Sequence, residues 1–137
     1  MVAVITVVDA NIVIAHLDAD NALHEEASAA LATIPKPERG IAAITRSEVL
    51  VAFARAGILD QGRAVFTNLG ITTLPLPPAD QWADSIATLR ASTRLKTPDA
   101  IVLDAALRSH AAVASLDFAL RRAAQGAGLP LVPPLLD

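Results

Sequence analysis

Four acidic residues stand where strands or helices are expected to begin or end. Asp9 and Asp117 each follow an apolar run, Glu48 lies within AAITRSEVLVAFA, and Asp99 follows a Thr-Pro pair. The chain has no Cys, so a metal would have to bind oxygen or histidine nitrogen. Carboxylate oxygens favour Mg²⁺ or Mn²⁺ over zinc. Such an ion can polarise a phosphodiester and lower the pKa of a bound water, so the pattern is compatible with metal-assisted hydrolysis.

Each of these acids also has an ordinary structural role open to it. Asp9 and Asp117 could cap a helix or close a turn through nearby backbone amides, and Asp99 could oppose the positive end of a helix. Thr45 and Glu48 have the T-x-x-E spacing of a capping box, in which each satisfies a backbone amide of the other. The sequence therefore leaves Glu48 as either a cap or a catalytic group.

Asp104 differs from the other acids because five helical positions rotate it about 140° away from the direction of Asp99. We expect it to face solvent or to pair with Arg108 at i,i+4. The three His show no H-x-x-x-H spacing, which argues against a zinc site. A nucleophile elbow, a Walker loop and a G-x-G-x-x-G turn are also missing from the sequence.

The elements that must position the acids alternate between strands and helices. The first run is apolar on both faces, as in a central parallel strand covered on each side. This alternation predicts one α/β domain over residues 1–137, with three layers and a central, mainly parallel sheet covered by helices on both faces. We expect strands at 1–8, 40–44, 71–76, 112–116 and 129–132, and helices at 11–17, 22–33 (capped by residue 20 or 21), 45–55, 60–68, 79–91, 100–109 (with its start at 97–99) and 118–125.

In such sheets, sites form outside the carboxyl ends of the strands. We therefore place Asp9 and Asp117 at strand ends and Glu48 and Asp99 in the first turns of the helices that follow. Four acids that are distant in the sequence would then meet at one edge of the sheet.

Charge and hydropathy limit the possible partners. The net charge of −3 argues against a protein that grips nucleic acid by charge alone. The only compact basic stretch, Arg90, Arg94 and Lys96, is either a phosphate track or an ordinary solvated helix end. With one Trp, three Phe and no Tyr, extensive base stacking is not expected. The first apolar run is too short to span a bilayer and lacks the features of a signal peptide, so we expect a cytoplasmic protein without a membrane segment.

Four segments in order resemble the PIN-domain ribonucleases, and more narrowly the VapC toxins of bacterial toxin–antitoxin pairs. The resemblance spans nearly the whole chain. It implies that Asp9, Glu48, Asp99 and Asp117 are the metal-binding acids. The segments are Val-Val-Asp9-Ala-Asn11-Ile-Val-Ile, Ile-Thr45-Arg-Ser47-Glu48-Val-Leu, Thr97-Pro98-Asp99-Ala-Ile and Ala-Ser115-Leu-Asp117-Phe118.

The resemblance also assigns supporting residues. Asn11 matches the polar residue that often follows the first acid, and Thr45 and Ser115 match hydroxyls that support the site. Asp9 and Asp99 are the first choice of direct ligands. The other two acids would bind through water, complete a second metal position or orient the nucleophile.

The function implied is that of a divalent-metal-dependent endoribonuclease, the toxin of a type II toxin–antitoxin system. It would use Mg²⁺, with Mn²⁺ as a possible substitute, and cleave RNA with metal-activated water. The resemblance further implies a VapB-like antitoxin whose tail covers the acidic site, and a homodimer. One alternative is a PIN-like module that binds RNA or protein without cleaving. A receiver-type signalling domain is less favoured, because Asp9 has no acidic neighbour and no Lys follows Lys96.

Overall fold

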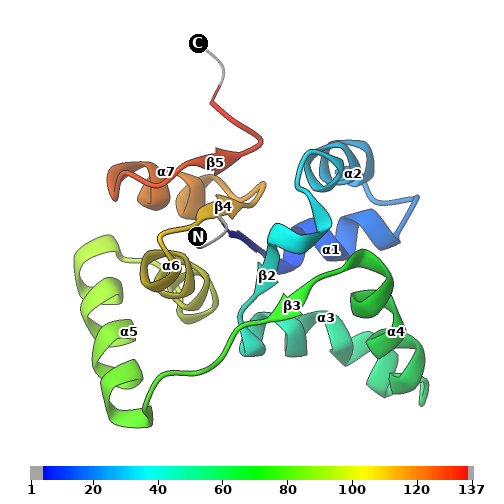
Figure 1. The fold of residues 1–137 in the computed structure, drawn as a ribbon, viewed down its shortest axis with the longest axis horizontal. Coiled ribbons are helices and arrows are strands. Elements are labelled where there is room, and N and C mark those ends of the chain that lie inside the picture. The colour runs from blue at the N-terminus through cyan, green and yellow to red at the C-terminus, as the bar shows by residue number, and fades with distance from the viewer. Residues whose placement is uncertain (1–4, 136–137) are drawn as a thin grey trace.

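The computed structural model describes residues 5–135 and contains a five-stranded sheet (Figure 1). The strand order is β3-β2-β1-β4-β5, and every neighbouring pair is parallel. Val7 of the central strand pairs with Gly40 on one side and Val113 on the other. The strands are β1 Thr6–Val8, β2 Arg39–Ile41, β3 Thr72–Thr73, β4 Ala112–Ala114 and β5 Leu131–Val132.

Seven α-helices and a short 3-10 helix connect these strands in the described part of the chain. The core divides into two clusters because successive strand residues point to opposite faces. Val7 belongs to the cluster with α5, α6 and α7, whereas Val8 belongs to the cluster with α1, α2, α3 and α4. The predicted three-layer α/β fold with a parallel sheet is therefore confirmed. The helices are α1 Ala10–Leu17, α2 His24–Ala32, α3 Ala43–Arg55, α4 Leu59–Leu69, α5 Ala79–Thr93, α6 Thr97–Ser109 and α7 Phe118–Gly126, and the 3-10 helix is Lys36–Glu38.

The helix start predicted at Thr45 is wrong, and of the two roles left open for Glu48 the capping box does not form. Helix α3 begins two residues earlier, after Ala42, and no side chain caps it. Thr45 is the third helical residue, and its buried hydroxyl has no hydrogen-bond partner among the described residues. Glu48 consequently lies in the second turn of the helix, not the first as predicted. The tertiary burial of Thr45 overrides the local sequence pattern.

Other element boundaries also differ from the prediction. Helix α2 begins at His24, and the Asn21 carboxamide accepts from the Leu23 amide in the preceding turn instead of capping the helix. Helix α4 begins before Asp60, and β3 covers only two of the six residues expected. The first four residues of the strand expected at 1–8 lie outside the described residues.

Arg39 ties the C-terminal ends of two helices to the sheet. It is 8% exposed, and its guanidinium donates to the carbonyls of Ile34 (2.9 Å), Leu31 (2.7 Å) and Leu69 (2.7 Å). Helix ends leave carbonyl groups without internal partners, and a cation suits the negative end of the helix dipole. A single buried cation in β2 therefore holds the ends of α2 and α4 together.

No helix within residues 5–135 has the length and apolarity needed to cross a bilayer.

Candidate active site

All four predicted acids line one cavity of about 310 Å³ at the carboxyl edge of the sheet. Asp9 and Asp117 precede α1 and α7, Asp99 lies in the first turn of α6, and Glu48 projects from α3. The structure thus brings three acids at helix starts together with Glu48 from the second turn of α3, at the edge of the sheet that the α/β topology predicts. The cavity is also lined by Ala10, Asn11, Ile14, Ala15, Asn21 and Leu23.

Asp9 is the most firmly held of the four acids. It is only 8% exposed, and one carboxylate oxygen accepts from the Ala10 amide at 2.8 Å, so that it caps α1. The other oxygen accepts from the Ser115 hydroxyl at 2.7 Å. Burial raises the pKa of Asp9, the two hydrogen bonds lower it, and the charges of Asp117 and Glu48 raise it further.

Ser115 links the first and last of the four site acids, Asp9 and Asp117. Besides donating to Asp9, its hydroxyl accepts from the Asp117 amide at 3.0 Å. Asn11 lies beside it, with its amide nitrogen 3.5 Å from the Ser115 hydroxyl and its carbonyl oxygen 3.4 Å from the Leu116 amide. This network fixes the end of β4 against the start of α1.

Asp117 serves as both cap and cavity wall. One carboxylate oxygen accepts from the Leu120 amide at 2.9 Å, which caps α7. Asp117 can therefore cap α7 and contribute a carboxylate to the acidic cavity at the same time.

Asp99 and Glu48 have no hydrogen-bond partners for their carboxylates within residues 5–135, and Glu48 is exposed. Burial, followed by the charges of Asp117 and Asp9, raises the pKa of Asp99 from 3.8 to about 6, against an opposing effect of Lys96. Partial burial of the carboxylate, followed by the charge of Asp99, raises the pKa of Glu48. Like charges held together in this way favour protonation of one of them or the arrival of a cation.

The donor set fits a hard cation that keeps most of its water. Within residues 5–135, no three Asp, Glu or His side chains are placed to hold one metal ion together. Mg²⁺ commonly binds through only one or two carboxylates and completes its shell with waters and substrate phosphates. The oxygen-only chemistry and mutual repulsion of the acids suit that mode, whereas a cage made only of protein ligands does not fit.

Two other predicted residues lie outside the acidic cavity. Thr45 lines neither this cavity nor the larger one described next. Asp104 is 4% exposed and pairs with the Nε of Arg108 at 2.9 Å. The predicted ion pair is confirmed, and the alternative of a solvent-facing Asp104 is wrong because α6 is buried along this stretch.

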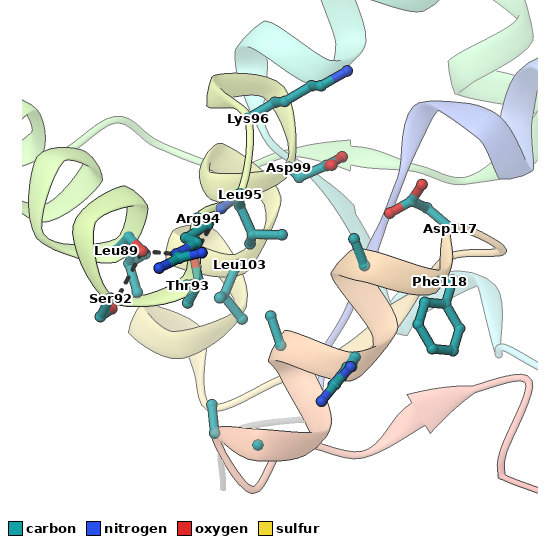
Figure 2. Close-up of a pocket in the computed structure, with 15 residues that line it drawn as sticks. Leu89, Ser92, Thr93, Arg94, Leu95, Lys96, Asp99, Leu103, Asp117 and Phe118 are labelled. Carbon is teal, nitrogen blue, oxygen red and sulfur yellow. Dashed lines mark hydrogen bonds between the residues drawn. The ribbon is translucent and has the colours of Figure 1, made fainter.

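A second, open cavity of about 1020 Å³ adjoins the acids between α5, α6 and α7 (Figure 2). It shares Asp99 and Asp117 with the acidic cavity, and their carboxylates point toward one another in Figure 2. Arg94 and Lys96 line it, as the basic stretch suggested. Arg90 does not line it, and instead donates to the Leu95 carbonyl at 3.3 Å.

Sequence reasoning missed two residues of this second cavity, Phe118 and Arg122. Phe118 follows Asp117 directly and is 76% exposed, which is unusual for a large aromatic side chain. Arg122 is four positions further along α7, so the two side chains share one face of the helix. That i,i+4 spacing after a site acid is the signal that could have identified them.

Comparisons with known proteins agree with this fold. Comparison with curated protein sequences gives no match. Among solved structures, a toxin–antitoxin complex from Klebsiella pneumoniae is similar, with a TM-score of 0.67 and 26% identity over 82% of this chain and 86% of that chain. A Pyrobaculum aerophilum protein shares the fold, with a TM-score of 0.59 and 18% identity over 95% and 90% of the two chains. The family model described as PIN domain matches residues 6–126. The chain thus belongs to the PIN domain family.

Proposed function

We propose that this protein is a divalent-metal-dependent endoribonuclease that acts as the toxin of a type II toxin–antitoxin system. PIN domains are generally nucleases. The observation that carries the proposal is the convergence of Asp9, Glu48, Asp99 and Asp117 on one cavity, where burial and the neighbouring acid charges raise the pKa of Asp9, Glu48 and Asp99.

In the proposed reaction, Asp9 and Asp99 would hold Mg²⁺, or Mn²⁺ in its place. The ion supplies Lewis-acid polarisation of the phosphodiester and a more acidic water. Ser115 holds the Asp9 carboxylate in one orientation, and Asp117 is held by the start of α7. Glu48 is exposed and has no hydrogen-bond partner among the described residues, so its carboxylate is free to accept the proton of the attacking water.

The toxin assignment is supported by the similarity to the Klebsiella complex. We propose a VapB-like antitoxin as the partner, with a basic side chain that enters the acidic cavity and replaces the metal charge. A homodimer and a cytoplasmic location complete the proposal.

The test uses purified protein freed of any partner and a panel of tRNA, rRNA fragments and mRNA. Cleavage is expected with Mg²⁺, and not with EDTA or in Asp9→Asn. Cleavage that persists unchanged in EDTA would refute the metal mechanism.

A PIN-like module that binds RNA without cleaving it is the second candidate. In that case the acids, no three of which are placed within residues 5–135 to hold one metal ion together, would support RNA binding without metal-dependent cleavage. RNA binding without cleavage of any RNA in the panel, with Mg²⁺ or with Mn²⁺, would support this candidate.

A further inference from the structure

The basic side chains of this chain are mostly committed to internal contacts. Of its eleven Lys and Arg residues, seven donate hydrogen bonds within the described residues. The other four have no hydrogen bond or ion pair in residues 5–135, and three of these four line the larger cavity. They are Arg94, Lys96 and Arg122, whereas Arg55 lies elsewhere, in the last turn of α3. In a protein of net charge −3, this concentration points to an anionic ligand.

The backbone at Arg94 adds a second observation. Arg94 ends α5 with a φ of 62°, in the left-handed region that favours glycine. Helices commonly end with glycine in this conformation. An arginine at this position carries a conformational cost, and its guanidinium makes no hydrogen bond or ion pair within residues 5–135 that would offset it. The cost is explained if the charge is needed in the cavity.

Phe118 supplies an exposed aromatic ring next to Asp117 in the chain, and in Figure 2 this ring points away from the carboxylates of Asp117 and Asp99. Its side chain is 76% exposed and lines the larger cavity immediately after Asp117 (Figure 2). Exposed aromatic rings next to cations form the stacking platforms of proteins that bind single-stranded nucleic acid. A duplex would keep its bases stacked inside and unavailable to such a ring.

We infer that this cavity binds the single-stranded nucleotides next to the scissile phosphate, with Arg94, Lys96 and Arg122 contacting phosphates and Phe118 stacking on one base. The inference rests on the proposed function and extends it. The cavity shares Asp99 and Asp117 with the acidic site, so a strand held in it leads directly to the metal-binding acids.

Binding is measured on the Asp9→Asn protein with Mg²⁺, using a fluorescent single-stranded oligoribonucleotide of mixed sequence at several salt concentrations. Removal of each cation, in Arg94→Gln, Lys96→Gln or Arg122→Gln, is expected to reduce the slope of log K against log salt by about 0.7. The control Arg55→Gln leaves the slope unchanged. If the slope falls equally in the three cavity variants and in the control, or in none of them, the proposed phosphate contacts are wrong.

Phe118→Ala is expected to weaken binding about five- to hundredfold without changing the salt slope. Phe118→Trp restores affinity, and a duplex of the same sequence binds no more weakly to Phe118→Ala than to the parent. If Phe118→Ala has no effect and polyglutamate displaces the oligonucleotide, the cavity is a site for acidic protein segments and the inference is wrong.

Arg94→Gly separates a binding role from a structural one. Because glycine suits the left-handed conformation, this variant is expected to unfold at a higher temperature while its salt slope falls as in Arg94→Gln. A lower unfolding temperature would show that the arginine side chain stabilises the fold, contrary to the inference.

The inference and the proposed function fail in distinguishable ways. If the wild type cleaves RNA with Mg²⁺ but all the cavity variants keep its KM, the inference alone is wrong. If the Asp9→Asn protein shows the predicted binding pattern and the wild type cleaves nothing, the binding site stands without the nuclease. An Asp9→Asn protein that binds no RNA overturns the inference.

Discussion

Asp99→Asn should stabilise the metal-free protein, because Asp99 is ionised at pH 7.5 although its surroundings disfavour the charged form. Burial and the charges of Asp117 and Asp9 raise its pKa from 3.8 to about 6. A difference of about two pKa units corresponds to roughly 3 kcal/mol. Asp99 is partly exposed, so solvent screening reduces this to about 1.5 kcal/mol. The substitution also removes an acidic charge from the first turn of α6, and losing its interaction with the helix dipole reduces the gain in stability by about 0.5 kcal/mol.

The net gain of about 1 kcal/mol predicts a rise in the unfolding temperature of about 4 °C at pH 7.5 in EDTA. In the wild type, the pKa of Asp99 is higher in the folded state than in the unfolded state, so the folded state binds more protons between about pH 4 and 6. The stabilising contribution of Asp99 protonation is therefore complete below pH 4 and is lost as pH rises through 6. The advantage of Asp99→Asn should shrink steadily as the pH is lowered from 7.5 to 4.5.

Thermal unfolding of both proteins, with and without Mg²⁺, measures these effects. Mg²⁺ should raise the unfolding temperature of the wild type more than that of Asp99→Asn, because a ligand of the folded state stabilises it. Asp84→Asn, which removes an exposed acid on α5 outside both cavities, is the control for net charge. The reasoning would be refuted if the unfolding temperature of Asp99→Asn were lower than that of the wild type by the same amount at pH 7.5 and at pH 4.5.

Four further substitutions test the remaining structural roles. Glu48→Gln should change the free energy of unfolding by less than about 0.5 kcal/mol and lower the cleavage rate about a hundredfold or more, because Glu48 is exposed and unbonded; normal cleavage would exclude a catalytic role. Ser115→Ala should cost about 1–3 kcal/mol in urea unfolding, since it leaves the buried carboxylate of Asp9 short of a donor; a neutral result would contradict the network. Arg39→Met should cost about 3 kcal/mol or more, because three carbonyls, two of them buried, lose their donor, and unchanged urea unfolding would refute that account. Thr45→Val should be neutral or stabilise by about 1 kcal/mol with normal cleavage, as it removes a buried hydroxyl without a partner; loss of cleavage alone would restore a supporting role in the site.

The α/β fold was predictable because its signals are local in the sequence. The alternation of apolar runs with helical patterns indicated a parallel sheet, and a parallel sheet brings strand ends to one edge. Asp9 and Asp117 could therefore be placed together from sequence. Strand lengths were less predictable, since β3 consists of only two paired residues within a longer extended segment.

The start of α3 shows where local rules failed. Thr45 and Glu48 satisfy the capping-box spacing, but the helix starts at Ala43 because packing buries Thr45 inside it. Glu48 is thereby released from any capping role and lines the acidic cavity. The choice between cap and catalyst, open in the sequence, was decided by packing in favour of the cavity.

By itself, the sequence determined the order and chemistry of the four acids, the parallel α/β architecture and the resemblance to PIN-domain ribonucleases, because these depend on residue type and short-range pattern. Only the tertiary structure decided which cations remain unpaired beside the acids and that Phe118 is exposed there. Those facts depend on how α5, α6 and α7 pack, and helices distant in sequence adopt their relative positions only once the core has formed.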